Sequence, residues 1–166
     1  MKKKTAEMYG GRSASGMNIL EEIVKTINNS NISQADVLES FAIYARRINI
    51  TRFLAHYELY KMVADLPGCI VECGVYQGNS LFAFAKFLEI FHPGDRIRHV
   101  IGFDSFEGLQ NFTDKDGPLY PVVSKVEGGW SAKEFKDTFY ELVDLYHADQ
   151  FVPHAPRIKI VEGNML

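Results

Sequence analysis

The sequence has little of what marks secreted, membrane-spanning or nucleic-acid-binding proteins. It holds two cysteines and one tryptophan in 166 residues, and no apolar run approaches the roughly 20 residues that cross a bilayer. Residues 1–4 are basic but no apolar stretch follows them, which is unlike a signal peptide. A net charge of -3 provides no basic surface for nucleic acid or anionic membranes. We therefore expect a cytoplasmic protein without nucleic-acid or membrane partners.

The two cysteines, Cys69 and Cys73, flank one apolar stretch. Along a strand they would lie about 13 Å apart at roughly 3.3 Å per residue, which is too far for a disulfide. The sequence places no histidine near them, so they make a poor zinc site. We expect both thiols to be reduced, as is usual in the cytoplasm.

Two common phosphate-binding motifs are also missing. A Walker A loop needs a Lys-Ser/Thr pair after its glycines, and Gly78-Asn79-Ser80 has no lysine. A dinucleotide loop needs Gly-x-Gly-x-x-Gly, whereas this chain has Gly74 and Gly78 with Tyr76 at the place of the middle glycine. The bulky Tyr76 argues against a pyrophosphate at this turn. A nucleoside without phosphate there fits better, and S-adenosylmethionine is one such ligand.

The length and the composition are those of one globular domain. Apolar residues make up 46% and charged residues 23% of the chain, and 166 residues can bury a substantial core. Apolar spacing, caps and turn residues predict three helices and then alternating strands and helices. The predicted helices are 17–27, 33–48 with Ser33 as N-cap, 51–66, 81–91, and 132–146 with Ser131 as cap and Glu134 completing a capping box; the predicted strands are 69–73, 98–104 and 157–161.

This order predicts an α/β fold with a parallel sheet. Parallel strands joined by right-handed crossovers give three layers, and the first three strands lie side by side in the order 3-2-1. Glu72 and Asp104 stand at the carboxyl ends of two of these strands, and therefore at the same sheet edge. Such an edge forms a nucleoside-binding crevice. The long polar connection 105–129 is typical of a lid or binding loop.

The residues around these two acids resemble a known family. Residues 71–78 (VECGVYQG) and 102–109 (GFDSFEGL) look like the macrocin O-methyltransferase (TylF/MycF-like) family, and the second string is the more specific signal. The resemblance extends from about Tyr57 to Leu166. It implies a Rossmann-like class I methyltransferase sandwich, of which this chain would hold the N-terminal half. Residues 1–17 would then be a flexible N-terminus, 18–66 a helical segment and 67–166 a partial S-adenosylmethionine-binding domain.

The resemblance also implies roles for individual residues. The first cofactor loop would be formed by Glu72, Gly74 and Gly78, with Tyr76 and Ser80 near the amino-acid moiety. Asp104 would accept hydrogen bonds from the ribose hydroxyls, with Ser105 and Phe106 beside it. The adenine ring would be flanked by Gly163, Asn164 and Met165.

Each role has a structural alternative. Glu72 would instead cap the following helix or pair with a basic residue, and Asp104 would be an ordinary turn former at a strand end. Gly74 and Gly78 would serve only to pack helix against strand. The five histidines are scattered, which is typical of structural or solvated residues.

The chain departs from the family in its length. The family's metal-binding acids follow a fourth strand, and this chain ends before it, so no metal ligand and no catalytic base are assigned here. We expect a truncated methyltransferase whose full-length relatives use a divalent metal such as Mg. The unpaired edge of the first strand predicts a homo-oligomer or a marginally stable chain.

The function that we expect is S-adenosylmethionine-dependent methylation of a sugar or natural-product hydroxyl, with a small-molecule hydroxyl acceptor. The alternative is a catalytically inactive fragment that binds S-adenosylmethionine or a partner. A third hypothesis is a structural or oligomerisation remnant that binds no small molecule. A nicotinamide-dependent dehydrogenase is disfavoured by Tyr76.

Overall fold

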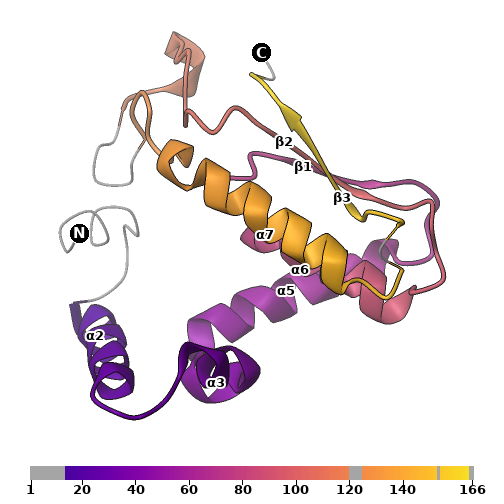
Figure 1. Ribbon diagram of the computed structural model, residues 1–166. Helices are drawn as coiled ribbons and strands as arrows, with labels where there is room; N and C mark the ends of the chain where they lie inside the picture. Colours follow the sequence, from indigo (N-terminus) through magenta and orange to yellow (C-terminus); the bar gives the residue numbers. More distant parts are fainter. Residues whose placement is uncertain (1–13, 120–124, 153, 165–166) are drawn as a thin grey trace.

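The computed structural model describes residues 14–119, 125–152 and 154–164. Helices come first, and strands then alternate with helices (Figure 1). The helices are α2 (Ala14–Asn28), α3 (Gln34–Glu39), α4 (Phe41–Tyr44), α5 (Arg47–Val63), α6 (Asn79–Phe91) and α7 (Lys136–Asp149); the strands are β1 (Ile70–Cys73), β2 (Val100–Asp104) and β3 (Ile158–Glu162); short 3-10 turns are η1 (Asp114–Asp116) and η3 (Lys133–Phe135). Of the stretch predicted to be loose, residues 1–13 lie outside the described residues and 14–17 begin α2.

The three strands form one parallel sheet in the order β1-β2-β3. This confirms the predicted α/β fold and the predicted neighbours, with β2 in the middle. The register pairs Cys73 with Phe103 and Asp104 with Glu162. The carboxyl ends of all three strands therefore meet at one edge, where the two predicted acids lie.

The helices cover only one face of the sheet. Figure 1 shows α5, α6 and α7 on the same side of the strands. On that side, Val100 of β2 is fully buried, and a Cβ on Gly102 would come within 2.5 Å of Val75 Cγ2. On the other side, Val71 is 57% exposed and Val161 is 46% exposed. The sequence predicted three layers, and this is wrong for the described residues, in which helices cover one face of the sheet only.

An aromatic cluster joins α5 to α6. Tyr57 and Tyr60 pack against the Phe87 ring, with both pairs of ring centroids 5.5 Å apart. Phe53 adds a third contact to the same ring at 4.9 Å. Phe87 and Tyr60 are each only 2% exposed, so this cluster is the main hydrophobic link between the N-terminal helices and the sheet domain.

The predicted helix 33–48 is broken in the structure. Ser33 caps α3 as predicted, with Asp36 completing a capping box. The helix then stops at Ser40, α4 follows, and α5 begins at Arg47. The apolar residues of this stretch, such as Ile43, are largely exposed. Without packing of an apolar face, helical spacing alone does not stabilise a long helix.

The capping prediction at Ser131 is wrong. The 3-10 turn η3 comes first and α7 begins only at Lys136. The Ser131 hydroxyl donates to the Phe106 carbonyl at 3.0 Å and accepts from the Lys133 amide at 3.3 Å. It therefore ties two loops together instead of starting the α-helix.

Two further expectations concern single features. Cys69 and Cys73 are both free, as the strand spacing predicted. Among the helices of the described residues, none combines the length and the apolar character that crossing a membrane requires.

Candidate cofactor and acceptor pocket

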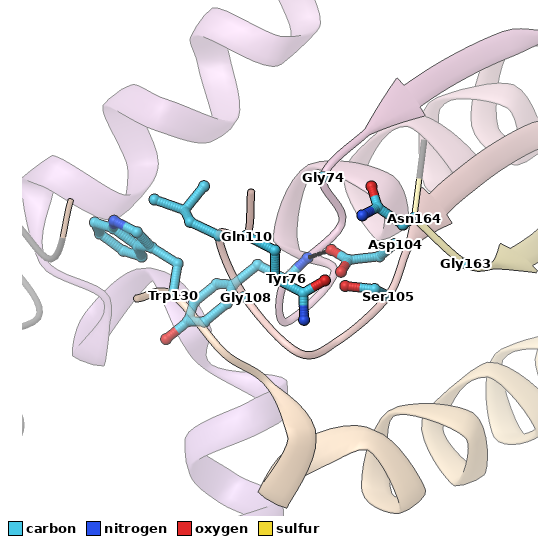
Figure 2. Close-up of a pocket in the computed structure, with 10 residues that line it drawn as sticks. Gly74, Tyr76, Asp104, Ser105, Gly108, Gln110, Trp130, Gly163 and Asn164 are labelled. Atoms are coloured by element: carbon cyan, nitrogen blue, oxygen red, sulfur yellow. Dashed lines mark hydrogen bonds between the residues drawn. The ribbon is translucent and has the colours of Figure 1, made fainter. Parts of the chain in front are cut away.

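A cavity of about 550 Å³ opens at the carboxyl edge of the sheet (Figure 2). Six of the predicted site residues line it: Gly74, Tyr76, Asp104, Ser105, Gly163 and Asn164. Four others that we had not assigned to the site also line it: Gly108, Leu109, Gln110 and Trp130. Glu72, Gly78, Ser80 and Phe106 are not among its lining residues, and Met165 lies outside the described residues.

Asp104 is fixed by two backbone amides at the centre of this edge. The Tyr76 amide donates to Oδ2 at 2.7 Å, and the Phe106 amide donates to Oδ1 at 2.7 Å. Both donors have positive φ, 55° and 60°, which is uncommon for bulky residues. Asp104 thus has the turn-forming role that was its alternative, yet each carboxylate oxygen keeps a further lone pair for a ligand hydroxyl.

Glu72 lies behind the first turn. Its Oε1 accepts a hydrogen bond from the Ser80 hydroxyl at the start of α6, while its buried Oε2 has no partner within the part of the chain that the structure describes. Burial raises the pKa of Glu72, the Ser80 hydrogen bond lowers it, and the negative charge of Asp104 raises it further. An unpaired buried acceptor is costly, and a cationic ligand group would relieve this cost.

The two glycines of the first turn differ in their surroundings. Gly74 has φ +87°, and a Cβ at this position would have no other atom within 4 Å, so the glycine leaves space in the pocket. Gly78 has φ +80°, and a Cβ there would lie 2.6 Å from Phe139 Cε2 of α7. The packing alternative therefore describes Gly78, whereas Gly74 leaves room for a ligand.

Phe106 contributes its backbone to the site and its side chain to the core. The residue is 1% exposed, and its ring lies 5.4 Å from that of Phe139. The resemblance placed Phe106 beside Asp104, and its amide does donate to Asp104, while its ring packs in the core and does not line the pocket.

The far wall of the pocket is built by two loops that are bound together through their backbones. Leu109 donates to Gly129 at 2.8 Å, and Gly128 donates to Leu109 at 2.8 Å. Gly108 permits this approach, because a Cβ there would lie 2.5 Å from the Gly129 oxygen. Trp130 follows this contact. The sequence marked the connection 105–129 as a binding loop, but nothing local indicated which residues would line the wall.

The described residues do not offer a metal site. Within 14–119, 125–152 and 154–164, no three side chains of His, Cys, Asp or Glu gather closely enough to hold an ion.

The fold and the pocket together define a Rossmann-like α/β protein with a binding site at the carboxyl edge of its parallel sheet. No protein-family model and no curated protein matches the sequence, but solved structures do. A crystal structure of CalS11, a calicheamicin methyltransferase, matches with a TM-score of 0.80 and 27% identity, over 92% of this chain and 59% of that chain. An apo structure of CalS11, described as a TDP-rhamnose 3'-O-methyltransferase in calicheamicin biosynthesis, matches with a TM-score of 0.69 and 27% identity, over 92% and 57%.

These likenesses confirm the predicted fold and support a methyltransferase. The chain spans less than two thirds of the length of either matched structure. The TylF/MycF-like assignment, the truncation and the roles of the individual site residues stay predictions.

Proposed function

We propose that this chain binds S-adenosylmethionine and takes part in the transfer of its methyl group to a sugar hydroxyl. The observation that carries the proposal is Asp104, held by two backbone amides at the carboxyl edge of the sheet and facing the 550 Å³ pocket. Ligands of open α/β sheets bind at such edges. The likeness to a sugar O-methyltransferase supports the choice of reaction.

The residues present fit the cofactor in chemistry. The free lone pairs of Asp104 suit two vicinal ribose hydroxyls, and Gly74 leaves open space beside them. The unpaired Oε2 of Glu72 suits the ammonium of the amino-acid moiety. Gly163 and Asn164 would flank the adenine. When bound, S-adenosylmethionine would supply a methyl group activated by its sulfonium.

This chain's own contribution would be positioning. Asp104 would anchor the ribose, and the charge of Glu72, which lies behind the first turn and outside the pocket lining, would attract the ammonium end, so that an acceptor hydroxyl meets the methyl group in line. Holding two reactants in this way supplies a large part of the rate acceleration in such reactions. No described residue is assigned as the base that takes the hydroxyl proton.

We also infer self-association of the chain. β1 has a single strand neighbour within the described residues, and the sheet face that carries Val71 and Val161 is uncovered. Unpaired strand edges and apolar faces favour association. A monomer at all concentrations in sedimentation velocity would contradict this.

The first test is calorimetric titration with S-adenosylhomocysteine. We expect micromolar binding to the wild-type chain. Asp104→Asn removes the charge from the proposed ribose contact and turns an NH2 group towards one of the two backbone donors, and it should weaken binding by about tenfold or more, because hydrogen bonds to charged groups contribute about 1.5–3 kcal/mol. The control is Glu107→Gln in the same loop, where Glu107 is exposed and pairs with Lys133 at 3.0 Å.

The outcomes separate the parts of the proposal. A folded wild-type chain that does not bind S-adenosylhomocysteine would falsify the proposed function. Equal binding by wild type and Asp104→Asn would remove the ribose role alone. Binding without transfer of a labelled methyl group to TDP-rhamnose would favour the alternative of an inactive binding module.

A further inference from the structure

Trp130 has a backbone conformation that is costly for a bulky residue. Its φ is +60°, in the left-handed region that favours glycine. Backbone hydrogen bonds flank Trp130 on both sides: the Gly129 amide donates to the Val126 carbonyl at 2.8 Å, and the Ala132 amide donates to the Phe106 carbonyl at 3.0 Å. A glycine would adopt this conformation at lower cost. Strained residues of this kind cluster at functional sites.

Tyr76 and Phe106 are two other aromatic residues with positive φ, and Trp130 differs from Phe106 in the burial of its side chain. The amides of Tyr76 and Phe106 each donate to Asp104, and the Phe106 ring fills the core. Trp130 is 38% exposed, so its large side chain is far from fully buried. Core packing therefore does not account for a tryptophan at this strained position.

The Trp130 side chain forms one end of the pocket. Figure 2 shows Trp130 at one end, Asp104 and Asn164 towards the other, and the Tyr76 ring between them. The Tyr76 and Trp130 rings meet edge to face, with centroids 5.6 Å apart and planes at 83°. This geometry leaves two aromatic surfaces at right angles on the Trp130 side of Asp104.

We propose that Tyr76 and Trp130 form the acceptor subsite and bind the sugar ring through its C–H face. This inference rests on the proposed function. The face of an aromatic ring carries partial negative charge, which suits the weakly positive C–H groups of a pyranose. The pair would hold the sugar so that one hydroxyl points towards the cofactor end, and it would act as a positioning element for the acceptor.

The experiment uses the fact that Trp130 is the only tryptophan of the chain. Tryptophan emission therefore reports on this one residue. The full chain is first saturated with S-adenosylhomocysteine, and TDP-rhamnose, methyl rhamnoside or TDP is then added. We expect a saturable change in emission with both sugars and none with TDP alone.

Variants supply the second readout, which is calorimetric affinity for TDP-rhamnose. Trp130→Gly should weaken it by about tenfold, whereas Trp130→Phe, which keeps a ring, should retain most of it. Binding of S-adenosylhomocysteine should change less than sugar binding in both variants. Trp130→Gly should also keep or raise the melting temperature, because it relieves backbone strain. The control is Phe151→Leu, an aromatic residue that is 79% exposed and does not line this pocket.

The inference is overturned if S-adenosylhomocysteine binds but no sugar changes the emission, or if TDP alone reproduces the change. It is also overturned if Trp130→Gly lowers the melting temperature and leaves sugar affinity unchanged, since that would make Trp130 a structural residue. Failure of S-adenosylhomocysteine to bind overturns the proposed function, and this inference with it.

Discussion

The two ends of the sheet are built differently. At the amino end, the buried Arg157 guanidinium pairs with Glu89 at 3.3 Å and donates to the His92 carbonyl at 2.9 Å. At the carboxyl end, Glu72 keeps a buried oxygen without a partner among the described residues. The positive-φ residues other than glycine in the described ranges, which are Tyr76, Phe106, Asn111 and Trp130, all follow β1 or β2. A buried ion pair stabilises the amino end, while positive-φ residues and the unpaired oxygen of Glu72 beside the pocket mark the carboxyl end as the proposed binding end.

The largest effect is expected at the amino end. Arg157 is 3% exposed, and Arg157→Met should lower the free energy of unfolding by about 3–5 kcal/mol, because it leaves Glu89 without its buried partner. Urea denaturation measures this. Arg96→Met, at an exposed arginine, is the control and should stay within about 0.5 kcal/mol of wild type. Equal losses in the two variants would show that the Arg157 ion pair does not hold this end together.

An intermediate effect is expected from the two glycines of the first turn. Gly78→Ala should destabilise the chain by about 1–3 kcal/mol beyond the backbone strain that both glycine positions share, because its Cβ would overlap the Phe139 ring. Gly74→Ala has no such clash and should cost only about 1–2 kcal/mol of backbone strain. Binding of S-adenosylhomocysteine should show the reverse order, with the greater loss in Gly74→Ala.

Denaturation and calorimetry on this pair separate packing from ligand contact. If Gly78→Ala lost more than Gly74→Ala in both stability and S-adenosylhomocysteine affinity, both glycines would act only through packing of the turn. That outcome would also remove Gly74 from the cofactor site.

The smallest effect is expected from Glu72, and its sign depends on pH. Burial raises the folded-state pKa of Glu72 above its usual value, so the folded chain binds more protons than the unfolded chain between these two values. Stability should therefore fall as pH rises through this window. Glu72→Gln should remove that fall and stabilise the unliganded chain at neutral pH, while weakening cofactor binding.

Urea denaturation across a pH series checks the prediction for Glu72. Glu141→Gln, at an exposed position of α7, is the control. A Glu72→Gln variant with the wild-type pH profile would show that burial of this acid has no effect on stability.

The binding end also shows which parts of the molecule the sequence could predict. β1 and β2 with their terminal acids were predictable because apolar runs, acids and glycines lie within a few residues of each other. The wall with Trp130 was not, because it depends on hydrogen bonds between residues 106–109 and 126–132, and no local pattern encodes that contact. Phe106 shows the same limit. Its sequence position predicted that it lies at the site, but it did not predict which way the ring points. The prediction of a continuous helix over 33–48 was wrong, because the periodicity of apolar residues does not reveal whether another element packs against them.

The contact between the two loops has a consequence for how the pocket can change during evolution. The hydrogen bonds between Leu109, Gly128 and Gly129 join backbone groups, so they survive almost any exchange of the neighbouring side chains. Only Gly108 is constrained by the approach itself. Positions such as Gln110 and Trp130 can therefore be substituted while the wall keeps its shape. The proposed acceptor subsite can therefore take a different ligand after the exchange of a few wall residues, without rebuilding the loops that carry them.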